Sequence, residues 1–193
     1  MNEFQLYFKI GYQHIADFRG IDHILFVTAL CLRYQFPDWR KILVLVTAFT
    51  IGHSITLALS VFNVVNYPVK WIEFLIPVTI VITAISNVFV KKFAFKTRFP
   101  VIYFFALFFG LIHGLGFSSY LKSLLGTDRG IVTQLLAFNL GLEVGQLLIV
   151  TAVLLISFIF VGILKISRRE YLLWVSGGIF ALALQMALER IPS

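Results

Sequence analysis

Long apolar stretches, separated by short polar turns, divide the chain into six segments. They run from His14 to Arg33, Lys41 to Val64, Val69 to Val90, Pro100 to Leu125, Ile131 to Leu164 and Tyr171 to Ala187. Most of them reach the ~20 residues that an α-helix needs to cross a ~30 Å hydrocarbon core. The alternating pattern of outer-membrane strands does not occur. The pattern predicts an all-α fold, a polytopic membrane bundle of about six transmembrane helices, forming a single transmembrane domain over residues 1–193.

Two segments differ from a regular transmembrane helix of about 20 apolar residues. Asp17, Arg19 and Asp22 interrupt the first, so its helix is the least regular of the six. The fifth is longer than a span requires, which indicates a helix that is tilted or that extends beyond the bilayer.

Composition supports a membrane protein and excludes other classes. Hydrophobic residues make up 60% of the 193 residues and charged residues 13%, against about 45–50% and about 25% in soluble domains. The net charge of +7 is carried mainly by short loops, without the basic stripe of a nucleic-acid-binding surface. Cys31 is the one cysteine, so a disulfide within the chain is excluded and a thiolate metal cluster is disfavoured.

The distribution of Lys and Arg predicts the orientation. Ten of the sixteen basic residues lie in the loops after the first, third and fifth segments. By the positive-inside rule these loops are cytoplasmic, and both termini lie outside a bacterial-type inner membrane.

Ionisable residues recur at similar depths in four of the segments. His23, His53, His113 and Glu143 lie roughly 15–22 Å, at 1.5 Å per residue, from the charged residues that end their segments. An ionised side chain at the centre of a bilayer costs at least ~2.5–3.5 kcal/mol, so these groups should face the interior of the bundle. Imidazoles with one or two carboxylates suit zinc, nickel, cobalt or iron. We therefore predict a divalent transition-metal site within the membrane.

Further residues extend this candidate site. Asp22 precedes His23, and on a regular helix the two point about 100° apart unless the chain unwinds near Gly20. His14 is a further candidate ligand close to the outer interface. Four residues are expected to support the ligands rather than to bind metal directly: Asn139, Gln146, Glu73 and Ser54. The alternative is that these polar groups only join neighbouring helices by hydrogen bonds.

Four motifs carry a family resemblance. They occupy Gly20–His23, Phe49–Leu57, Phe109–Phe117 and Phe138–Gln146, in this order. Together they resemble the successive motifs of the HupE/UreJ family of membrane proteins. The resemblance implies a nickel or cobalt permease with Asp22, His23 and His113 on the metal pathway. His113 stands alone where better-studied members have two histidines, which is typical of a divergent branch.

Three functions remain open at this point. The first is a permease for a divalent metal, nickel or cobalt. The second is an intramembrane zinc hydrolase that acts on a lipid or peptide from the outer face, with Asp22 or Glu143 as general base. The third is a structural subunit with a polar core. The expected partners are the lipid bilayer, a metal ion and, as an open alternative, a second copy of the chain.

Overall fold

The computed structural model describes residues 2–17, 20–90, 93, 101–124 and 130–192, and this part of the chain is helical without a strand. Five helices are long and apolar enough to cross a membrane. They are α3 (Trp39–Val61), α4 (Val69–Val88), α5 (Val101–Leu124), α6 (Ile131–Ser157) and α7 (Arg168–Glu189). A 3-10 turn, Phe36–Asp38, precedes α3, and a π-helical stretch, Phe158–Ile163, extends α6 to 33 residues. The predicted all-α membrane bundle of about six helices is confirmed.

The first predicted segment, His14 to Arg33, is not one continuous helix. Helix α1 covers Glu3–Ala16, and a second, short helix, α2, covers Asp22–Cys31. Only the first three residues of the segment belong to α1, most of which lies before the segment and was not predicted. Asp17 ends α1 in an extended conformation, and Asp22 opens the first turn of α2. Aspartate favours a break because its side chain can hydrogen-bond nearby backbone groups in place of the helical bonds, and glycine favours one because it loses more backbone entropy in a helix. Aspartate is also stabilising in the first turn of a helix, where its charge interacts favourably with the helix dipole. The interruption noted in the sequence is therefore a real break in the helix.

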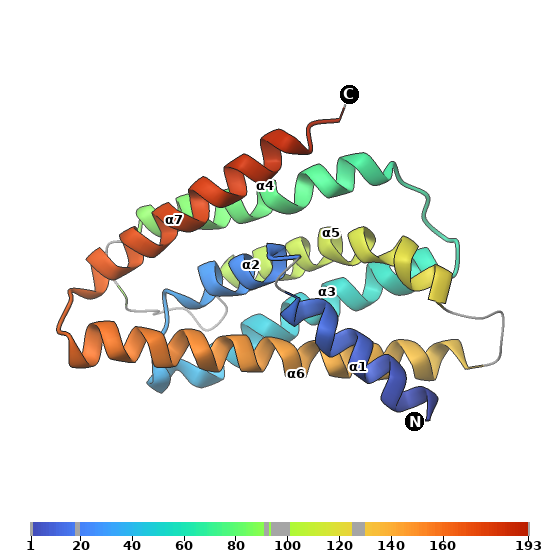
Figure 1. The fold of residues 1–193 in the computed structure, drawn as a ribbon, viewed down its shortest axis with the longest axis horizontal. Helices are drawn as coiled ribbons and strands as arrows, with labels where there is room; N and C mark the ends of the chain where they lie inside the picture. The colour runs from blue at the N-terminus through green and yellow to red at the C-terminus, as the bar shows by residue number, and fades with distance from the viewer. Residues whose placement is uncertain (1, 18–19, 91–92, 94–100, 125–129, 193) are drawn as a thin grey trace.

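Three closely packed helix pairs surround the short helix α2. Helix α3 packs on α5, α1 on α6, and α4 on α7, and α2 contacts α1, α4, α6 and α7. In Figure 1 the N-terminus and the α3–α4 connection lie toward one end of the bundle, and the α2–α3 and α6–α7 connections lie toward the other. The break between α1 and α2 lies between these ends, in the middle of the molecule (Figure 1).

Glycines bring two of these pairs into backbone contact. A Cβ atom at Gly52 would lie 2.1 Å from the carbonyl oxygen of Leu107, and one at Gly110 would lie 2.2 Å from that of Phe49. In the α1–α6 pair, a Cβ at Gly11 would lie 1.9 Å from the carbonyl oxygen of Phe138. Such close approach is the usual role of small residues between membrane helices.

A polar network closes the end of the bundle that carries Arg33, Arg168 and Arg169, here called the arginine end. Arg33 donates to Asn87 Oδ1 and to Ser86 Oγ, at 2.5 Å each. The buried Asn87 amide donates to the Ala29 carbonyl at 2.9 Å and to Ser176 Oγ at 3.0 Å. Helices α2, α4 and α7 are thus joined at this end.

Candidate metal centre

Four histidines from four helices meet beside the break between α1 and α2. His14 lies in the last turn of α1, and His23 lies in the first turn of α2. His53 and His113 lie in the middle of α3 and α5. One nitrogen from each of His14, His23 and His53 lies within 4.8 Å of the others. The His113 ring lies 5.2 Å from the His23 ring. Two nitrogens bound to one ion at about 2.1 Å lie at most about 4.2 Å apart, so small side-chain movements would let three imidazoles share a cation.

These imidazoles carry buried nitrogens without a hydrogen-bond partner. They are Nε2 of His14, Nε2 of His23, both ring nitrogens of His53, and Nδ1 of His113. A buried polar atom left unpaired costs about 1–3 kcal/mol, and folded proteins contain few of them. Five such nitrogens at one place are typical of a site that binds a ligand rather than of a packed structural core.

Thr79 fixes the tautomer of His113. Its hydroxyl donates to the Ile76 carbonyl at 2.6 Å and lies 3.2 Å from Nε2 of His113. Because a hydroxyl has one hydrogen to donate, Thr79 must accept from His113 Nε2–H. Nδ1 of His113 then keeps its lone pair, as a metal ligand requires.

Phenylalanines enclose the four histidines. Phe117 stacks on His14 with 3.7 Å between ring centroids, and Phe26 lies 5.0 Å from the His113 ring. Phe49 and Phe138 lie 6.1 and 6.2 Å from the His53 ring. These aromatic rings limit the access of water to the histidines. A cation bound there must therefore be coordinated mainly by protein atoms.

The candidate carboxylates are held by other partners. The Asp22 carboxylate pairs with Arg190, with nitrogen–oxygen distances of 3.3–3.4 Å. Glu143 Oε1 accepts a hydrogen bond from Thr47 Oγ1 at 2.9 Å. Neither is a member of the three-histidine group found among the described residues.

The four predicted supporting residues take different positions. Gln146 is buried, and its side-chain oxygen accepts a hydrogen bond from Thr50 Oγ1 at 2.7 Å. Thr50 lies on α3, one helical turn before His53. Asn139 donates to the Leu135 carbonyl, and Ser54 donates to the Thr50 carbonyl. Glu73 is exposed on α4.

Sequence reasoning pointed to Asn87 as a polar position on α4 but did not recognise that Thr79 and Thr83 share its face. Thr79, Thr83 and Asn87 recur every four residues and are all buried. That spacing places them on one side of a helix, and it was visible in the sequence. The face leads from His113 to the arginine end.

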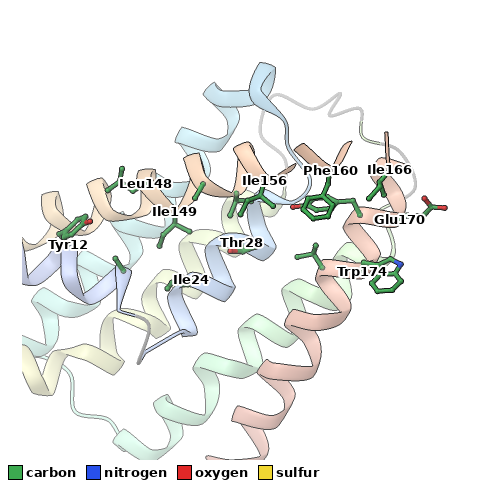
Figure 2. Close-up of a pocket in the computed structure, with 15 residues that line it drawn as sticks. Tyr12, Ile24, Thr28, Leu148, Ile149, Ile156, Phe160, Ile166, Glu170 and Trp174 are labelled. Carbon is green, nitrogen blue, oxygen red and sulfur yellow. The ribbon is translucent and has the colours of Figure 1, made fainter. Parts of the chain in front are cut away.

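An apolar groove runs past the break on the side of α6 and α7. Its cavity volume is about 980 Å³, and Figure 2 shows Tyr12 near one end and Glu170 and Trp174 near the other. Ile24 and Thr28 of α2 also line it. The four histidines are not among the lining residues.

Comparison with known proteins identifies the family of the chain. A family model described as HupE / UreJ protein matches residues 1–190, nearly the whole chain. No curated protein and no solved structure matches the chain. Because this match covers nearly the whole chain, the protein belongs to the HupE/UreJ family.

Proposed function

We propose that this protein is a permease for a divalent metal, nickel or cobalt, with the four-histidine cluster as the binding site on the transport pathway. The HupE/UreJ family, known for nickel and cobalt transport, fits a membrane metal permease. The observation that carries the proposal is the set of unpaired buried imidazole nitrogens from four helices. Imidazole ligands suit nickel, cobalt and zinc.

The broken helix supports transport. Transporters commonly bind their ions where a membrane helix is interrupted, because the ends of the two half-helices point at the site. Here α1 ends and α2 begins beside the histidines. The C-terminal end of α1 carries the negative end of its helix dipole near His14, and the N-terminal end of α2 carries a positive end near His23, so the two dipoles together favour neither sign of charge.

The proposal requires the bundle to open at the arginine end. The contacts of Arg33 with Asn87 and Ser86 join α2 to α4, and Arg168 donates to the Arg33 carbonyl at 2.6 Å. An ion that leaves the histidines toward this end must pass these groups. We therefore propose that release needs a rearrangement of α2 against α4 and α7.

We also propose that α1 and α2 together cross the membrane once, as two half-spans, so that both termini lie outside. The arginine end then faces the cytoplasm, in agreement with the positive-inside rule. Fusion of a cytoplasm-active reporter to the C-terminus gives no signal if this topology holds. A strong signal there refutes it.

The test of function uses proteoliposomes with a metal-sensitive dye inside. The protein as purified should carry Ni²⁺ or Co²⁺ inward, and the double variant His53→Ala, His113→Ala should lose the flux. Gln185→Ala, an exposed change on α7, is the control and should transport like the parent. If the double variant folds and still transports, the histidine pathway is wrong.

A zinc hydrolase is the second candidate, and the apolar groove is the observation that favours it. A lipid chain in the groove would lie beside the break, although the three histidines able to hold zinc with an open position do not themselves line the groove. Against it, the candidate bases Asp22 and Glu143 are engaged with Arg190 and Thr47. One firmly held zinc ion per purified chain, without flux in proteoliposomes, would favour the hydrolase over the permease.

A further inference from the structure

Arg190 and Asp22 form an ion pair at the break, next to the histidine cluster. The two guanidinium nitrogens Nη1 and Nη2 lie 3.3–3.4 Å from the carboxylate oxygens. Charge-assisted hydrogen bonds are usually 2.7–2.9 Å long, so this pair is loosely made. The side chains of Arg190 and Asp22 are 35% and 14% exposed, so the carboxylate is the more buried partner.

The positions of Asp22 and Arg190 at helix ends allow the Arg190 side chain to leave the Asp22 carboxylate. Asp22 is the first residue of α2 and directly precedes His23, whose ring is 7% exposed within the cluster. Arg190 follows the last residue of α7, Glu189, and is its C-cap. The backbone N–H of Arg190 donates to the carbonyls of Met186 and Ala187, but its side chain can move without breaking these bonds. Arg190 can therefore leave Asp22 at little cost to α7.

We infer that Arg190 competes with the cargo cation for the Asp22 carboxylate and so sets the affinity of the metal site. The inference rests on the proposed permease function. When a divalent ion binds the histidines, unwinding of the first turn of α2 would let Asp22, which points about 100° away from His23 on a regular helix, turn toward the ion, and Arg190 would be displaced. The guanidinium acts as a resident cation that keeps the carboxylate neutralised until the cargo arrives.

The chemistry of the two cations gives this competition a selective effect. The guanidinium charge is single, delocalised and only weakly hydrated. A divalent transition metal attracts the same carboxylate more strongly, since attraction scales with charge. Monovalent cations lack this advantage over Arg190.

The test is calorimetric binding of Ni²⁺ and Co²⁺ to the purified, detergent-solubilised chain. Arg190→Gln should bind the metal about tenfold more tightly than the parent, a size typical of coupled sites. Arg190→Lys keeps the charge and should bind nearly as the parent does. Asp22→Asn should bind more weakly, and Arg190→Gln should bring no gain when Asp22 is already Asn. Arg190→Met, which keeps the apolar stem, replaces Arg190→Gln if the latter fails to fold.

The outcomes separate the inference from the proposed function. If the parent binds metal and Arg190→Gln or Arg190→Met binds equally or more weakly, Arg190 is a structural tether and the inference is overturned while the permease stands. If the parent binds neither Ni²⁺ nor Co²⁺, the proposed function fails and the inference fails with it. Tighter binding that depends on Asp22 supports the inference, because loss of a structural contact would not raise affinity.

Discussion

Gly110→Ala should disturb both the fold and the metal site, because Gly110 lies where α5 touches α3. A Cβ at this position would be 2.2 Å from the Phe49 carbonyl oxygen and 3.1 Å from the backbone nitrogen of His53. Both neighbours are backbone atoms of a helix, so neither can rotate away. Ala at this position therefore has to push α3 and α5 apart.

The magnitude follows from that contact. Ordinary van der Waals contact begins near 3.4 Å, so the helices must separate by about 1 Å. Overpacking of this kind costs about 1–3 kcal/mol, and sometimes more. Metal–ligand distances tolerate only about 0.2 Å, and His53 and His113 lie on the two separated helices. We expect metal affinity to fall about 10–100-fold, as when the hydrogen-bond support of a ligand is lost.

The assay is thermal unfolding in detergent, together with calorimetric Co²⁺ binding. Gly178→Ala on α7 is the matched control, because nothing lies within 4 Å of the Cβ it would add. In a helix interior Ala is favoured over Gly by about 0.5–1 kcal/mol, so this variant should be as stable as the parent or slightly more so. Equal stability and equal affinity for both alanine variants would refute the close α3–α5 contact as a determinant of the site.

Three further predictions test the surroundings of the site. Thr79→Val removes the acceptor for His113 Nε2–H and should weaken Co²⁺ binding about 10–100-fold, whereas Thr79→Ser should bind normally; equal binding of all three proteins in calorimetry would contradict the tautomer assignment. Asn87→Leu removes the amide that joins Arg33, the Ala29 carbonyl and Ser176, although Arg33 keeps its bond to Ser86, so the free energy of unfolding should fall by more than about 2 kcal/mol in denaturant titrations; a change below about 0.5 kcal/mol would show that the network is dispensable. Trp174→Ala removes a side chain that is 83% exposed, so unfolding should shift by less than about 0.5 kcal/mol; a larger loss would mean that Trp174 is covered in the protein as it exists in detergent.

The long helices were predictable because hydrophobicity and length decide them. Apolar runs near 20 residues have few alternatives in a bilayer, and the predicted and observed limits of the helix at Val69–Val88 differ little. The side of α3 that faces the interior was also predictable, since Thr50, His53, Thr56 and Ser60 recur near helical spacing. All of them are buried except Thr56, which is half-buried. Local pattern thus predicted which side of a helix is interior.

Contacts between distant parts of the chain were not predictable. Asp22 and Arg190 are 168 positions apart, and no local pattern pairs them. The distance between His14 and His23 depends on how the chain turns between α1 and α2, because the break decides whether the two rings meet. Their ring centroids are 4.6 Å apart. The sequence indicated an interruption there, but the direction of the turn follows from packing of α1 on α6 and of α2 on α4.

The charge of the site bears on how firmly the proposed permease would hold its ion. Four neutral imidazoles bring no negative charge to a divalent cation, and charge inside a membrane is costly without compensation. The carboxylates of Asp22 and Glu143 are directed to Arg190 and Thr47. A site that gains its negative charge only when an ion displaces Arg190 binds more weakly than one with a carboxylate permanently in place. Weak, reversible binding is what a permease needs, because its ion must also leave, whereas a catalytic zinc ion must remain through many turnovers.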